Sequence, residues 1–214
     1  MRPVSMRAAR GFTLVELLVV MAIIATLMGL GMTVLPAMMQ RGKKSAVENY
    51  LALLSANLET YKSSGQGAYP PTTLADYAGV GTLSDFRNSG IEALVLCLTS
   101  RAYGNPLDLE NLKELRIENY DGDQTQVQLT NGGARDLFEI VDPWGTPLVY
   151  FHCADYGRYA TVGLVAADKD DLKVKPWMND KLKKYYQSDR FQLISAGPDG
   201  VFNTEDDITN FDRR

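Results

Sequence analysis

The clearest pattern in the chain is an apolar run close to its N-terminus. The run extends from Phe12 to Leu35, and Glu16 is its one charged residue. As a helix it would be roughly 36 Å long, against about 30 Å for the hydrocarbon core of a bilayer. The pattern therefore predicts a membrane-spanning helix over residues 12–36, preceded by a short leader over residues 1–11.

The charges that flank this run predict how it is oriented. Three arginines and no acid precede it, whereas Arg41, Lys43 and Lys44 follow it. Because the first charges usually set orientation, we expect the leader on the cytoplasmic side. Two other interpretations stay open. A removed secretory signal would have a small-x-small cleavage site at Gly29-Leu30-Gly31, and a plain single-span anchor would explain the length but not Glu16.

Beyond Pro36 the pattern becomes amphipathic. Apolar residues recur at spacings of three and four, as on one face of a helix. These residues are Val47, Tyr50, Leu51, Leu54, Leu58 and Tyr61. We expect a helix over residues 37–64 that ends in the glycine- and serine-rich stretch 63–67, with its apolar face in a core.

The sequence of the remaining chain predicts a short helix and several short strands. Residues 89–96 read as a short helix, and 148–151 and 191–194 as strands. Asp121-Gly122 predicts a hairpin with arms at 112–118 and 124–130. The expected fold class is α+β, with a long N-terminal helix packed on a small antiparallel-sheet head over residues 37–214.

The composition and net charge of the chain argue against two classes of function, nucleic-acid binding and catalysis. The 214 residues carry a net charge of −4, which becomes −7 without the three leader arginines, so nucleic-acid binding is not expected. The only histidine, His152, adjoins Cys153 on a predicted strand, where neighbours point to opposite faces. We therefore expect no enzyme. Whether Cys97 and Cys153 form a disulfide stays open.

One acidic loop, residues 195–208, suggests metal chemistry. Asp199 and the Asp206-Asp207 pair stand on a segment with Gly197, Pro198 and Gly200, which can fold tightly. These carboxylates would repel each other without a cation between them. Hard oxygen ligands at this irregular spacing suit Ca²⁺, and the absence of histidine and cysteine argues against zinc. The order of an EF-hand loop is missing.

The segment Arg10 to Glu16, Arg-Gly-Phe-Thr-Leu-Val-Glu, resembles the signal of type IV pilins and type II secretion pseudopilins. The resemblance implies that a prepilin peptidase cleaves between Gly11 and Phe12 and that Phe12 is then N-methylated. A lone carboxylate in hydrocarbon costs several kcal/mol, so Glu16 is expected to have a partner. In a filament that partner would be the freed amino terminus of a neighbouring subunit.

Three further segments resemble the major pseudopilins: 69–73 with 89–96, then 142–150, then 195–208. In 142–150 Leu148 replaces the usual aromatic residue. The last resemblance implies a calcium loop with side-chain ligands from Asp199, Asp206 and Asp207. It also implies backbone oxygens near Ala196 and Val201, with Thr204 close by. Segments 74–88 and 105–135 have no counterpart and read as insertions.

The resemblance as a whole implies a structural subunit of a periplasmic pseudopilus that drives type II secretion. The subunit would be a single-pass inner-membrane protein with its head in the periplasm. Its expected partners are further copies of itself, prepilin peptidase, the inner-membrane assembly platform and minor pseudopilins. Two alternatives stay open: a type IV pilus subunit for adhesion, motility or DNA uptake, and a membrane-anchored calcium-binding module that never polymerises.

Overall fold

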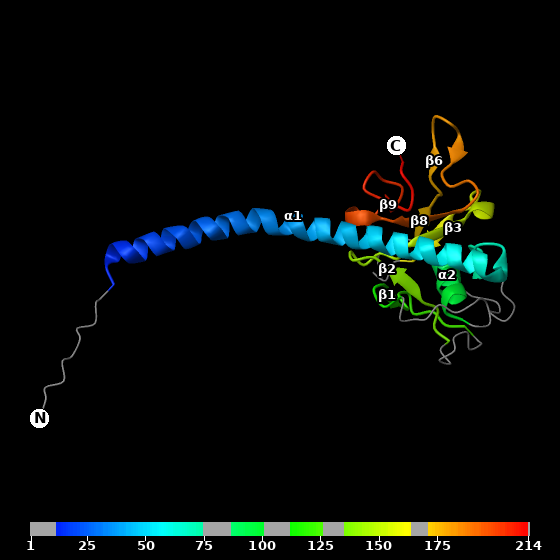
Figure 1. The fold of residues 1–214 in the computed structure, drawn as a ribbon, viewed down its shortest axis with the longest axis horizontal. Coiled ribbons are helices and arrows are strands. Elements are labelled where there is room, and N and C mark those ends of the chain that lie inside the picture. Colours follow the sequence, from blue (N-terminus) through cyan, green and yellow to red (C-terminus); the bar gives the residue numbers. More distant parts are fainter. Residues whose placement is uncertain (1–11, 75–86, 101–111, 126–134, 164–170, 214) are drawn as a thin grey trace, which may run out of the picture. The chain divides into compact units, whose positions relative to one another are not determined.

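The computed structural model describes residues 12–74, 87–100, 112–125, 135–163 and 171–213, with the side chains of 30–34 and of 65 and 66 left aside. The chain forms two units, residues 1–42 and 43–214. The first contains the N-terminal part of helix α1, Leu14–Tyr61, with Pro36 inside the helix (Figure 1). Among the described residues, we find no helix with both the length and the apolarity needed to cross a membrane.

Helix α1 ends where the sequence predicts. A single π-helical turn, η1, Lys62–Gln66, follows it, and Gly67 closes the helix in a left-handed conformation at φ 71°. The left-handed region is cheap for glycine and costly for other residues, which explains a glycine at this position. The predicted apolar face is confirmed, since Val47, Leu51, Leu54, Leu58 and Tyr61 are all buried, and Tyr50 packs at the edge of the same core.

In the residues that the structure describes, the second unit adds one further α-helix and four small antiparallel sheets. Helix α2 is Ser89–Thr99, and short 3-10 turns lie at η4, Cys153–Asp155, and η5, Gly197–Asp199. The largest sheet has the order β3, Val149–His152, β8, Phe191–Ser195, and β9, Ile208–Thr209. Each of the other three has two strands: β1, Arg116–Glu118, with β2, Glu139–Val141; β4, Ala160–Val162, with β5, Leu172–Val174; and β6, Met178–Asn179, with β7, Lys184–Tyr185. The α+β fold predicted from the sequence is confirmed.

Strands β3 and β8 divide the core into two clusters. Tyr150 and Leu193 face the stripe of α1 and the apolar face of α2, whereas Phe151 and Ile194 face the other side. Successive strand residues point to opposite faces, so each strand supplies both clusters. Figure 1 shows β3 and β8 beside the C-terminal part of α1 within this unit.

The hairpin predicted around Asp121-Gly122 is wrong in its pairing. The turn itself exists, with Gly122 at φ 80° and its N–H donating to Asn119 Oδ1 at 2.7 Å. However, β1 pairs with β2, and Gln124 bridges to Asp136, so the returning arm lies beyond residue 134. Residues 126–130 of the predicted arm, and parts of both predicted insertions, lie outside the described residues.

Candidate functional site

The N-terminal residues of α1 give Glu16 a partner within its own chain. Thr13 precedes the helix, and its backbone N–H and hydroxyl both donate to Glu16 Oε2, at 2.9 and 2.8 Å. In return the Glu16 N–H donates to Thr13 Oγ1 at 3.2 Å. This reciprocal arrangement is a capping box, which satisfies orphan donors at a helix start. Sequence reasoning missed it, although threonine followed three residues later by glutamate is its usual signature.

The capping box leaves part of the Glu16 carboxylate available. Only Oε2 accepts from Thr13, and the Glu16 side chain is exposed. Phe12, the predicted new terminus, is also exposed, with 79% of its surface accessible. Gly11, the other half of the predicted cleavage site, lies outside the described residues. Phe12 thus lies two residues before α1, and Glu16 lies in the first turn of that helix.

The loop after β8 is folded by its glycines. Gly197 and Gly200 both adopt φ 68°, and they flank Pro198 in the turn η5. A Cβ added at Gly197 would lie 2.5 Å from the backbone oxygen of Asp206, so the two ends of the loop approach each other at this point. Ser195, at the end of β8, donates to Asp142 Oδ2 at 2.7 Å and thereby fixes the start of the loop.

The predicted ligand residues lie together on this loop. Asp199 Oδ1 accepts from the Val201 N–H at 2.7 Å, and Asp206 Oδ2 accepts from the Asp199 N–H at 3.2 Å. Thr204 Oγ1 contacts both the Val201 carbonyl, at 3.1 Å, and Asp206 Oδ1, at 2.6 Å. These bonds link Asp199, Thr204 and Asp206 within the loop, and Ala196 is fully buried.

The two adjacent acids have opposite environments. Asp206 is half-buried, and the hydrogen bond from Thr204 lowers its pKa. Asp207 is buried, and burial raises its pKa despite hydrogen bonds from the Asn203 N–H and Trp177 Nε1. Its Oδ1 is buried without a hydrogen-bond partner. A buried carboxylate oxygen in this state fits a cation ligand, because burial without a partner is unfavourable.

Two residues outside the predicted set hold this loop. Trp177 Nε1 donates to Asp207 Oδ2 at 3.0 Å, and the Arg213 guanidinium lies 4.5 Å from the centroid of the Trp177 ring. Arg213 also donates to the backbone oxygens of Thr204, Glu205 and Asp207. Sequence reasoning missed both roles, because Trp177 is 30 residues from Asp207 and no local pattern links them.

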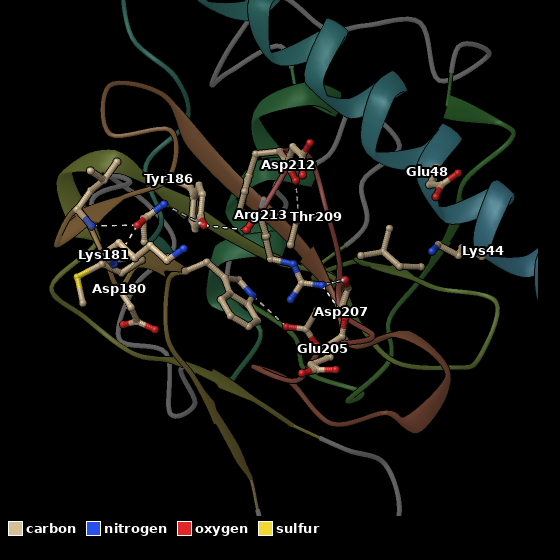
Figure 2. A pocket seen from close by; sticks show the side chains of 16 residues that line it. Lys44, Glu48, Asp180, Lys181, Tyr186, Glu205, Asp207, Thr209, Asp212 and Arg213 are labelled. Atoms are coloured by element: carbon tan, nitrogen blue, oxygen red, sulfur yellow. Dashed lines mark hydrogen bonds between the residues drawn. The ribbon is translucent and has the colours of Figure 1, made fainter.

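Trp177, Glu205, Asp207 and Arg213 line an open hollow of about 1060 Å³ within the second unit. Figure 2 shows Arg213 reaching toward Glu205 and Asp207, with Lys44 and Glu48 of α1 on another wall. The wall from Met178 to Leu182 carries Asp180 and Lys181, so charges of both signs line the hollow. Only the C-terminal end of the acidic loop, at Glu205, Asp207 and Ile208, contributes to the lining of this hollow.

A separate group of acids could bind a metal ion. Glu92, Asp121, Asp123 and Glu139 each offer a carboxylate oxygen, and these oxygens lie within 4.8 Å of one another. In the described part of the chain, the carboxylate oxygens of Asp199, Asp206 and Asp207 do not all come this close to one another, so the structure does not bring the three predicted loop ligands together. Sequence reasoning did not single out these four residues as a group.

His152 and Cys153 do not lie on one strand as predicted, because β3 ends at His152 and the turn η4 begins at Cys153. His152 Nδ1 accepts from the Ala154 N–H at 3.1 Å, and burial lowers the pKa of His152. Cys153 is half-buried and Cys97 is buried, and the structure forms no disulfide between them. The wider expectation that the protein is no enzyme remains a prediction.

The N-terminal helix and the small antiparallel sheets give the described residues the α+β, pilin-like fold that the sequence predicts. A family profile described as the prokaryotic N-terminal methylation motif matches residues 6–32. The chain is also similar to the type II secretion system core protein G of Escherichia coli K12. The two are 29% identical over 206 residues, which is 94% of this chain and 90% of that relative. The predicted resemblance to the major pseudopilins is therefore confirmed along almost the whole chain. No solved structure matches it.

Proposed function

We propose that this chain is a structural subunit of a type II secretion pseudopilus. The observation that carries the proposal is the conjunction of the methylation motif with similarity to a type II secretion core protein over 94% of the chain. On this proposal a prepilin peptidase removes residues 1–11, and the run from Phe12 anchors the subunit in the inner membrane. The head then lies in the periplasm, and the protein acts by assembly rather than by catalysis.

Assembly depends, on this proposal, on the charge of Glu16. After cleavage the Phe12 amino group is a cation, and a neighbouring Glu16 carboxylate neutralises it where neither ion is well solvated. The capping box consumes Oε2 through Thr13 and leaves Oε1 for that contact. The capping role and the pairing role of Glu16 are therefore separable by mutation.

Three variants test the pairing in cells that carry the whole secretion system. Glu16→Val removes both roles, Glu16→Gln keeps a capping oxygen but removes the charge, and Thr13→Val weakens the cap alone. We expect Glu16→Val and Glu16→Gln to stay in the membrane fraction without forming filaments or supporting secretion, while Thr13→Val still assembles. Normal filaments from Glu16→Gln would rule out the charge pairing and leave Glu16 with a capping role only.

We further propose that the C-terminal loop binds Ca²⁺ through Asp199, Asp206 and Asp207. Backbone oxygens near Ala196 and Val201 and the hydroxyl of Thr204 would complete the set. Carboxylate, carbonyl and hydroxyl oxygens are the ligands that Ca²⁺ prefers, and the orphan Asp207 Oδ1 supports such a ligand. Bound Ca²⁺ would stabilise the folded head by linkage.

A calcium titration tests this loop. Full-length protein in detergent is stripped with chelator and titrated by calorimetry as the wild type, as Asp207→Asn and as Asp189→Asn. Asp189 is an exposed acid outside the loop and serves as the matched control. We expect the loop variant to lose one binding event and some of the protease resistance that Ca²⁺ gives, and the control to lose neither. If Asp207→Asn bound as many Ca²⁺ ions per chain as the wild type, the loop would not be a Ca²⁺ site.

A further inference from the structure

Four carboxylates from distant parts of the chain converge in the second unit. Glu92 lies in the first turns of α2, Asp121 and Asp123 lie in the turn after β1, and Glu139 lies in β2. Their ligand oxygens lie within 4.8 Å of one another. Calcium binds oxygens at about 2.3–2.6 Å, so ligands on opposite sides of one ion are about 5 Å apart. The spacing of the four oxygens is therefore that of a single coordination sphere.

The burial of this group makes it unlike an acidic surface patch. Glu92 is 2% exposed and Glu139 is fully buried, whereas Asp121 and Asp123 are half-buried. Glutamate is almost never fully buried unless it is paired. Yet neither Glu92 nor Glu139 forms an ion pair within the part of the chain that the structure describes. Two carboxyl groups buried this close together must therefore be neutralised, either by a bound cation or by protonation.

A second observation concerns unpartnered oxygens at the same place. Glu92 Oε1 is buried without a hydrogen-bond partner, and so is Asn88 Oδ1. Asn88 is 4% exposed, and its Nδ2 donates to Asp121 Oδ2 at 2.9 Å and to Glu139 Oε1 at 3.4 Å, so its amide is aimed into the group. Which end of an amide is oxygen is assigned from its hydrogen bonds. Turned by half a rotation, the amide would direct its oxygen at the same point.

We propose that Glu92, Asp121, Asp123 and Glu139 bind one Ca²⁺, at a site separate from the C-terminal loop. The donors are hard oxygens only, as Ca²⁺ prefers. Half-buried Asp121 and Asp123 give the ion a path from solvent. The turn is already shaped to present them, since Asn119 accepts from the Gly122 N–H and donates to the Asp123 carbonyl. The ion would tie α2 to the β1–β2 sheet, and the proposal stands whether or not the chain forms a pseudopilus.

The competing explanation is a pair of protonated acids. Burial first, and the neighbouring acids with it, raises the pKa of both Glu92 and Glu139, which favours their protonated forms when no cation is present. The Glu139 Oε2 atom also accepts from the Tyr120 N–H at 2.7 Å, so this carboxyl is held in place in either state. A titration with Ca²⁺ separates the two explanations, because a site that holds protons alone gives no binding event.

The experiment uses full-length protein in detergent, stripped with chelator, in the Asp199→Asn/Asp207→Asn background so that the loop is silent. Calorimetric titration with Ca²⁺ should give one binding event in this background. Adding Glu92→Gln should abolish that event or weaken it at least a hundredfold, and adding Glu114→Gln should leave it unchanged. Glu114 is an exposed glutamate on the segment before β1 and is the matched control.

Several outcomes would overturn the proposal. One is no Ca²⁺ event in the folded background protein, and another is an event that survives both Glu92→Gln and Glu139→Gln. Equal affinity for Mg²⁺ would overturn the assignment to Ca²⁺. Because Gln is nearly isosteric with Glu and uncharged, both variants should remain folded. A thermal melt in chelator checks this, and it should show a midpoint no lower than that of the background protein.

Discussion

Replacing Gly90 by alanine is the sharpest test of how α2 docks on the sheet. A Cβ at this position would lie 2.5 Å from the backbone oxygen of Tyr150 in β3, where ordinary contact begins at 3.4 Å. Because that oxygen belongs to the backbone, no rotamer change can relieve the clash, and α2 must move away from β3. Overpacking of this kind costs about 1–3 kcal/mol. Alanine regains up to about 1 kcal/mol in helix propensity, so the net loss should be about 1–2 kcal/mol.

Urea unfolding followed by circular dichroism measures this loss. With a slope of about 2 kcal/mol/M, the Gly90→Ala midpoint should fall by roughly 0.5–1 M. Gly157→Ala is the control, because a Cβ added at Gly157 would have nothing within 4 Å and the φ of this residue is not in the left-handed region. Its midpoint should stay the same or rise slightly. An unchanged or higher midpoint for Gly90→Ala would refute the close approach of α2 to β3. In that case the higher helix propensity of alanine would be the only effect of the substitution, and it raises the midpoint.

Two further predictions concern buried polar groups in the same unit. Burial, with the neighbouring acids, raises the pKa of Glu92 and of Glu139. In chelator the folded chain then holds protons that the unfolded chain releases, so the free energy of unfolding should fall as pH rises above 4.5. Glu92→Gln should flatten that fall in urea melts at about pH 5 and about pH 7.5, and parallel curves for variant and wild type would contradict the raised pKa. Tyr150→Phe removes a 2.6 Å hydrogen bond to the buried Pro70 carbonyl and should cost about 1–3 kcal/mol. Tyr159→Phe, at a 58% exposed position, should cost nothing measurable, and equal melts for the two variants would mean that the Pro70 carbonyl finds another donor.

The helical part of the fold follows from the sequence because its pattern is local. The stripe from Val47 to Tyr61 repeats every three or four residues, and the structure buries that stripe. The end of α1 at Gly67 is also local, because a glycine there can adopt a left-handed conformation at low cost. The strand that follows Asp142-Pro143-Trp144-Gly145 is likewise predicted by the turn residues that precede it. In these segments a residue's conformation depends mainly on its immediate neighbours.

The pairing of β1 is different in kind. Asp121-Gly122 does form a turn, but the turn does not decide which segment returns beside β1. That choice depends on which faces become buried, and Ile140 in β2 is fully packed in the core. A hairpin signal read over a few residues contains nothing about a partner some twenty residues away. The error therefore came from treating a tertiary choice as a local one.

The candidate sites show the same division. The acids and glycines of 195–208 are contiguous, so their chemistry could be predicted, whereas the contacts from Trp177 and Arg213 could not. The group of Glu92, Asp121, Asp123 and Glu139 could not be predicted either, because these residues are far apart in the sequence. Its members come from α2, a turn and β2, and only the packed fold brings their oxygens within 4.8 Å. Sequence spacing alone would place Glu92 as an ordinary acid in the first turn of a helix.

The state of the two thiols has a practical consequence. Cys97 is fully buried and Cys153 is partly accessible, and no disulfide joins them. A maleimide dye should therefore attach at Cys153 while sparing Cys97, without any engineered cysteine. One fluorophore per subunit would then allow polymer growth to be watched by single-particle imaging in an otherwise native chain.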